Sequence, residues 1–98
     1  MTRKEILETA AACVFGQREE DYGSPEDNFK TIASLWDIYL QAAHTGSYIP
    51  ILSPKDVAIM MALLKIARIA SGKSTDSFVD LAGYAACGGE IGTGGNET

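Results

Sequence analysis

The sequence predicts an all-α domain of four helices, because apolar residues recur at helical spacing and each helix has its own start signal. No stretch alternates between polar and apolar residues as a half-buried strand would. The 98 residues, 46% of them hydrophobic, suffice for one domain. We expect residues 1–90 to form that domain and residues 91–98, which are poor in apolar side chains, to form a flexible tail.

The first two helices have clear local signals. The first is expected to begin after Thr2, where the order Thr-Arg-Lys-Glu is typical of a capping box, and to weaken at Gly16. Ser24 followed by Pro25 places a capping hydroxyl before a proline at the first helical position, where its missing N–H costs nothing. We expect this second helix to end at Gly46.

The third helix, over residues 54–71, repeats the cap-plus-proline device at Ser53 and Pro54. It is apolar nearly all round, so it must be central in a bundle or covered by another subunit. Because only three other helices are available, we expect an oligomeric helical bundle, a homodimer or homotetramer. Its large apolar residues are Val57, Ile59, Met60, Met61, Leu63, Leu64, Ile66 and Ile69.

The fourth helix is expected to start at a cap on Ser74 or Thr75 and to run to about Cys87. Both cysteines, Cys13 and Cys87, fall within helical patterns and lack Cys-x-x-Cys spacing. We therefore expect two small buried hydrophobes rather than a disulfide or a zinc site.

The composition of the chain disfavours nucleic acid and membranes as partners. The net charge of −5, from 13 acids and 8 bases, disfavours broad binding to nucleic acid. The longest apolar run, "VAIMMALL", is far shorter than the roughly 20 residues that span a bilayer, so we expect no membrane partner.

Lys65 and Arg68 are the charges inside the apolar third helix, and their spacing places both on one edge. Burying these two charges without a partner would cost free energy, so they must either pair with an anion or extend to the solvent. Two interpretations of these charges stay open. They bind a phosphate or carboxylate ligand, or they form ordinary salt bridges to Asp80 or to the acidic residues within 19–29.

Three further groups of polar residues have a spacing or position that could indicate a site, and each is compared with a purely structural role. Asp76 and Asp80 lie one helical turn apart and could hold a hard divalent cation, although a plain solvated face has the same pattern. Asn28 projects towards the apolar arc of the second helix and needs backbone or ligand partners there. Glu5 and Glu8 project away from the apolar stripe of the first helix, so we expect them at the surface.

Four motifs occur in order, within a similarity that spans residues 5–87: "REEDYGSPEDNF", "IASLW", "DVAIMMALLKIARIA" and "DSFVDLAGYAA". Together they resemble an uncharacterised helical family from phages and prophages. The Asp-Tyr-Gly, Lys-x-x-Arg and Asp-x-x-Gly-Tyr elements are also similar to a helical domain associated with phage nucleotide modification, and more distantly to MazG-like nucleoside triphosphate pyrophosphatases. By motif, this resemblance points to Asp21, Tyr22, Gly23, Lys65, Arg68, Asp80 and Tyr84.

In pyrophosphatases of that kind, acids on helices hold magnesium against the triphosphate. The chain departs from their Glu-x-x-Glu and Glu-x-x-Asp signatures, because Glu5 and Glu8 face outward and Asp76 and Asp80 are spaced differently. Whether the protein is an enzyme is therefore open.

Two hypotheses result. The first is a protein of phage nucleotide metabolism in the bacterial host's cytoplasm that binds a nucleotide or phosphate ligand, and that acts as a magnesium-dependent pyrophosphatase in its catalytic form. Its ligand residues would be Lys65, Arg68, Asn28, Tyr22 and Tyr84, and its metal residues Asp21, Asp76 and Asp80. The alternative is a non-enzymatic, oligomeric accessory or scaffold protein in which the charged residues form only structural ion pairs.

Overall fold

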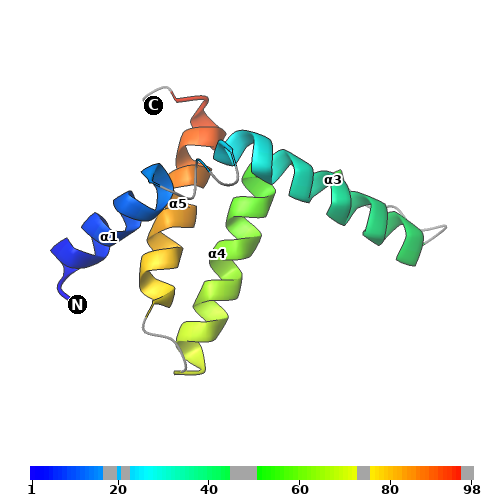
Figure 1. Ribbon diagram of the computed structural model, residues 1–98. Helices are drawn as coiled ribbons and strands as arrows, with labels where there is room; N and C mark the ends of the chain where they lie inside the picture. Colours follow the sequence, from blue (N-terminus) through cyan, green and yellow to red (C-terminus); the bar gives the residue numbers. More distant parts are fainter. Residues whose placement is uncertain (17–19, 21–22, 45–50, 73–75, 96–98) are drawn as a thin grey trace.

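A computed structural model of the chain describes residues 1–16, 20, 23–44, 51–72 and 76–95. Within these residues the chain forms no strand, and the prediction of an all-α fold with four helices is confirmed (Figure 1). The helices are α1 (Arg3–Phe15), α3 (Pro25–Ala43), α4 (Pro54–Ala70) and α5 (Ser77–Thr93).

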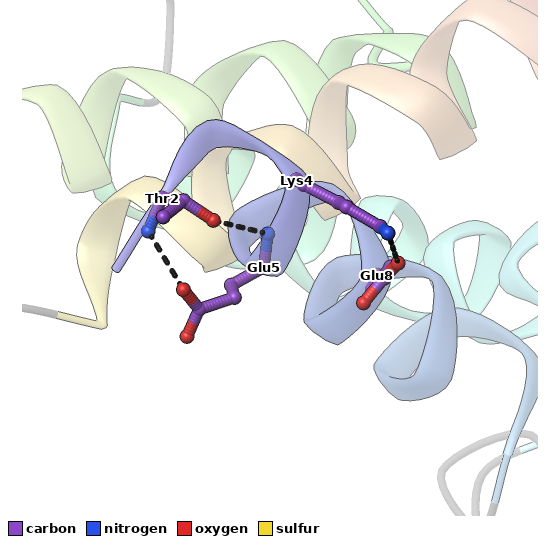
Figure 2. Close-up of polar contacts among 4 residues, drawn as sticks. All are labelled: Thr2, Lys4, Glu5 and Glu8. Atoms are coloured by element: carbon purple, nitrogen blue, oxygen red, sulfur yellow. Dashed lines mark hydrogen bonds and ion pairs between the residues drawn. The ribbon is translucent and has the colours of Figure 1, made fainter.

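The starts of α1 and α3 are held by the predicted caps. The Thr2 hydroxyl accepts a hydrogen bond from the Glu5 N–H at 3.1 Å, and the Glu5 carboxylate accepts one from the Thr2 N–H at 3.2 Å (Figure 2). This pair is the capping box expected from the sequence. At α3, the Ser24 hydroxyl accepts from the Asp27 N–H at 3.3 Å, and Pro25 occupies the first turn.

The start of α4 has a complete capping box in addition to the predicted Ser53 cap and Pro54. The Ser53 hydroxyl accepts from the Asp56 N–H at 3.3 Å, and the Ser53 N–H donates to the Asp56 carboxylate at 2.8 Å. The hydrogen bond from the Ser53 backbone, and to a smaller extent the one from the Ser53 side chain, lowers the pKa of Asp56. The neighbouring Leu52 N–H donates to Asp37 Oδ1 at 2.9 Å, which ties the start of α4 to the middle of α3.

Helices α4 and α5 lie side by side and carry most of the packing, while α1 rests on α5 and α3 rests on α4 (Figure 1). Gly88 permits the close approach, because a Cβ placed there would lie only 2.9 Å from the Cβ of Ala58. The buried core consists of Phe29, Ala33, Val57 and Ala58. Half-buried side chains pack around it: Ile32, Trp36, Leu52, Met61, Tyr84, Cys87 and Ile91.

Helix α3 extends away from the other three helices (Figure 1). Its first half is anchored by the buried Phe29 and Ala33, whereas Leu35, Ile38 and Tyr39 are 60–69% exposed. The radius of gyration is 14.9 Å, larger than the value of about 13 Å for a compact chain of 100 residues. The chain is therefore more open than a bundle that buries its own apolar surface.

The predicted end of the last helix is wrong: α5 continues past Cys87 to Thr93. Packing explains the difference, since Ile91 lies against the core and stabilises the turns that the glycines alone would weaken. The helix ends at Gly94, whose φ of 66° is left-handed and allows the N–H of the next residue, Gly95, to donate to the Glu90 carbonyl at 2.9 Å. The expected caps, Ser74 and Thr75, lie outside the described residues.

The other helix ends follow the sequence more closely. Helix α4 ends at Ala70, within one residue of the prediction, and α3 ends at Ala43 with His44 as its cap. The expected stop at Gly46 lies outside the described residues. None of the described helices is long and apolar enough to cross a membrane.

The outer face of α4 is apolar and open to solvent. We define it by five residues that are 41–58% exposed: Ile59, Met60, Leu63, Leu64 and Ile66. Only Val57 and Ala58, in the first turns of the helix, are buried. The chain by itself therefore covers one side of α4 and leaves the other uncovered.

Candidate functional site

A cavity of about 430 Å³ lies between α1, the start of α3 and α5. Its volume falls within the 300–1,000 Å³ of typical small-molecule sites. Its wall consists of Thr9, Ala12, Cys13, Val14, Gly23, Pro25, Asn28, Phe29, Val79, Asp80, Gly83, Tyr84 and Cys87.

The cavity exists because α5 presents small residues where α1 crosses it. A Cβ on Gly83 would lie 3.4 Å from the Val14 side chain, so α1 sits close to α5 at that point. On another side the rings of Phe29 and Tyr84 form an aromatic wall, with centroids 6.0 Å apart and planes inclined by 32°. The ring pair joins the cavity to the core, because Phe29 is itself a core residue.

Three of the predicted ligand and metal residues meet at this cavity: Asn28 from α3, and Asp80 and Tyr84 from α5. Asn28 is half-buried, and its side chain makes no hydrogen bond within the described part of the chain. An amide in that position can both donate to and accept from a ligand. The glycine of the Asp-Tyr-Gly motif, Gly23, also lies in the wall, whereas Asp21 and Tyr22 lie outside the described residues.

Lys65 and Asp80 form an ion pair across the contact between α4 and α5. The Lys65 ammonium lies 3.0 Å from Asp80 Oδ2, and the side chains are 14% and 39% exposed. A lysine so little exposed needs a counter-ion, which Asp80 supplies. Of the two open interpretations, the salt bridge to Asp80 is therefore present for Lys65, and Asp80 is itself a residue of the cavity wall.

Arg68 and Asp76 are not brought to the cavity wall. Arg68 is exposed in the last turn of α4 and has no ion pair among the described residues. A positive charge there is favourable, because the C-terminal end of a helix is partially negative. Asp76 is exposed at the start of α5, and its side chain does not cap the helix.

Within the described ranges, no three side chains of His, Cys, Asp or Glu are grouped so that they could hold a metal ion. The expected metal set includes Asp21, outside those ranges, so that set stays a prediction. Glu5 and Glu8 face outward as expected: Glu5 caps α1, and Glu8 forms an exposed ion pair at 3.9 Å with the lysine one turn earlier (Figure 2).

The contribution of α1 to the cavity wall was not predicted from the sequence. Thr9 and Cys13 reach the cavity from that helix, and Cys13 is exposed, so the expectation of a buried Cys13 is wrong. Since α1 packs against α5, only one side of it is covered. The apolar stripe of the helix includes Cys13 and was the available signal, but nothing local in the sequence tells which helix will face it.

The geometry defines an all-α domain with a small, mixed polar and aromatic cavity. The chain belongs to the family described as "Domain of unknown function (DUF6378)", which matches residues 5–92. The expectation of an uncharacterised helical phage family is therefore confirmed.

Two relatives are proteins of mycobacteriophages. The chain is similar to the "Gene 55 protein" of Mycobacterium phage D29, with 44% identity over 85 residues that cover 86% of this chain and 51% of that protein. It is equally similar to the "Gene 55 protein" of Mycobacterium phage L5, with 44% identity over 81 residues, 82% of this chain and 47% of that protein. The chain thus spans about half the length of these relatives. No solved structure matches it.

Proposed function

We propose that the protein binds a nucleotide in the cavity between α1, α3 and α5, in the nucleotide metabolism of a phage. The supporting observation is that Asn28, Asp80 and Tyr84, which come from two helices, line one cavity of about 430 Å³. The Tyr84 ring offers a surface for stacking against a base, and the amide and the carboxylate offer hydrogen bonds to its edge.

The phosphates are assigned to Lys65 and Arg68. The Lys65 ammonium has three donors, and its ion pair at 3.0 Å directs one of them at Asp80. Its other donors can contact a phosphate while the ion pair persists. Arg68 lies three residues further along α4 and adds a second positive charge, which a phosphate can bind in a bidentate manner.

The catalytic form is a separate proposal, in which the Asp80 carboxylate binds magnesium together with Asp21 and Asp76 instead of the base, and the protein releases pyrophosphate from a nucleoside triphosphate. Asp76 and Asp80 support it only by lying one turn apart at the start of α5. Binding and hydrolysis are separate claims, and they are tested separately.

Binding is tested by calorimetric titration and by thermal shift with nucleoside mono-, di- and triphosphates, with and without magnesium. We expect at least one nucleotide to raise the melting temperature. Asn28→Ala should weaken its binding, whereas Gln41→Ala, which removes an exposed amide from the same helix, should leave binding unchanged. Equal effects of the two variants, or no response to any nucleotide, would refute the proposal. Magnesium-dependent pyrophosphate release checks the catalytic form.

The second candidate is a non-enzymatic oligomer, and the outer face of α4 is the observation that favours it. Monomeric proteins rarely leave such a large apolar patch uncovered. The exposed residues of α3, Leu35, Ile38 and Tyr39, add a second apolar surface on the helix that packs against α4. In this candidate Lys65 and Asp80 form only a structural ion pair.

A second copy of the same chain is the proposed occupant, in a dimer or tetramer. The five apolar residues of the outer face span about two turns of α4, from Ile59 to Ile66, and the exposed apolar residues of α3 add further surface. An interface of ordinary size needs about 800 Å² per partner. The aliphatic character of this surface makes it chemically complementary to itself. Light scattering should give a multiple of the 10.4 kDa chain mass, and a monomer mass would refute this candidate.

A further inference from the structure

The described wall of the cavity carries no positively charged side chain. Asp80 is the only charged side chain among its described residues, and the other polar members of the wall are neutral: Thr9, Cys13, Asn28, Tyr84 and Cys87. A phosphate placed inside would meet no positive charge in the wall, because Lys65, the counter-ion of Asp80, lies outside it. The part of a nucleotide that enters this cavity is therefore the base.

The carboxylate of Asp80 also has a defined hydrogen-bonding role. An ionised carboxylate only accepts hydrogen bonds. Its Oδ2 is occupied by Lys65 at 3.0 Å, and no other contact to the carboxylate is made within the described chain. Oδ1 has no partner among the described residues, and Asp80 and Asn28 both line the cavity.

We infer that the cavity selects a nucleobase with an exocyclic amino group, which donates a hydrogen bond to the carboxylate of Asp80. This inference rests on the proposed function and adds the class of base to it. Adenine, guanine and cytosine carry such an amino group. A keto oxygen in the same place would face the carboxylate oxygen, so two acceptors would meet without a proton between them.

The test compares matched 5′-monophosphates that differ at the amino group: AMP with IMP, GMP with IMP, and CMP with UMP. Dissociation constants are measured by calorimetric titration at one salt concentration and without magnesium. We expect the amino form to bind about 10-fold or more tightly in at least one pair, as for a hydrogen bond to a charged acceptor.

If nucleotides bind but every pair agrees within two-fold, or the form without the amino group binds more tightly in every pair, the inference is wrong and the proposed function stands. If no nucleotide binds, with or without magnesium, the proposed function fails and the inference fails with it. The two failures are therefore distinguishable in one set of titrations.

Variants then assign the preference to Asp80. Asp80→Asn should reduce the preference for the amino form to within about three-fold, because the hydrogen bond loses its charge. Asp27→Asn is the matched control: it makes the same change at an exposed residue next to Asn28 but outside the cavity wall, and should keep the preference.

Asp80→Asn also deprives Lys65 of its partner, so circular dichroism must show that the variant folds. If it does not fold, the double variant Lys65→Met with Asp80→Asn removes both charges and takes its place. A folded variant that retains the full preference for the amino form would overturn the assignment to Asp80.

Discussion

Both faces of α4 carry apolar side chains, but the two faces have opposite surroundings. On the inner face, Val57 and Ala58 are buried against α3 and α5, and Lys65 reaches Asp80. On the outer face, residues as large and apolar as Leu63 are open to solvent. Hydropathy alone therefore does not locate the core of this domain. The neighbouring helices do, and the uncovered face marks where a neighbour is missing.

The largest expected effect is on the inner side, at Phe29, which is 4% exposed and contacts Tyr84. Phe29→Ala should lower the free energy of unfolding by about 3–5 kcal/mol, because it leaves a void between core and cavity. Phe78→Ala, at a ring that is 52% exposed, should cost less than about 1 kcal/mol. Urea unfolding followed by Trp36 fluorescence measures both. Equal losses would contradict the distinction between inner and outer side chains.

The next effect concerns the contact between α4 and α5. Gly88→Ala should destabilise the fold by about 1–3 kcal/mol, because the new methyl group would lie 2.9 Å from the Ala58 side chain. Gly89→Ala meets nothing within 4 Å and should stabilise α5 by about 0.5–1 kcal/mol. Thermal unfolding of the two variants should therefore shift in opposite directions. Shifts in the same direction would show that α4 and α5 do not approach closely at Gly88.

A smaller, pH-dependent effect lies in the first turn of α4, which carries its buried residues. Hydrogen bonds from Ser53 hold the pKa of Asp56 below its ordinary value of 3.8. This carboxylate therefore contributes stability that is complete above pH 3.8 and is lost as the pH falls through the lower folded value. Asp56→Asn should be less stable than the unaltered protein at pH 6, and the difference should shrink below pH 3.8. Urea unfolding across this range measures it, and a difference that is constant with pH would contradict it.

The smallest effect on folding, within about 0.5 kcal/mol, is expected for Leu63→Asp on the outer face. Its effect should instead be on assembly, because a charge in the centre of an apolar interface opposes association. Leu7→Asp is the control, since Leu7 on α1 is 64% exposed and Leu63 is 58% exposed. Light scattering should show a reduced mass for Leu63→Asp alone. A mass unchanged by it would place the interface elsewhere.

Much of the fold could be predicted because the signals are local. The capping residues Thr2, Ser24 and Ser53 each act within one turn, so the sequence alone indicates where α1, α3 and α4 begin. Asn28 was found for a similar reason: its helical projection towards an apolar arc already placed a polar group on a face that packs.

The remainder depends on contacts between residues far apart in the chain. The end of α5 at Thr93 follows from Ile91 packing on the core, and the α1 wall of the cavity follows from Val14 meeting Gly83. The exposure of the outer face of α4 likewise depends on which helices pack against it. No spacing within one helix encodes these contacts.

The most direct test of the central claim, nucleotide binding in the cavity, is a map of amide chemical shifts in the protein during titration with a nucleotide. We predict shifts at cavity residues of α1, α3 and α5, including Cys13, Asn28 and Tyr84, and none on the outer face of α4. Shifts confined to the outer face of α4, or none at a saturating concentration, would contradict the account.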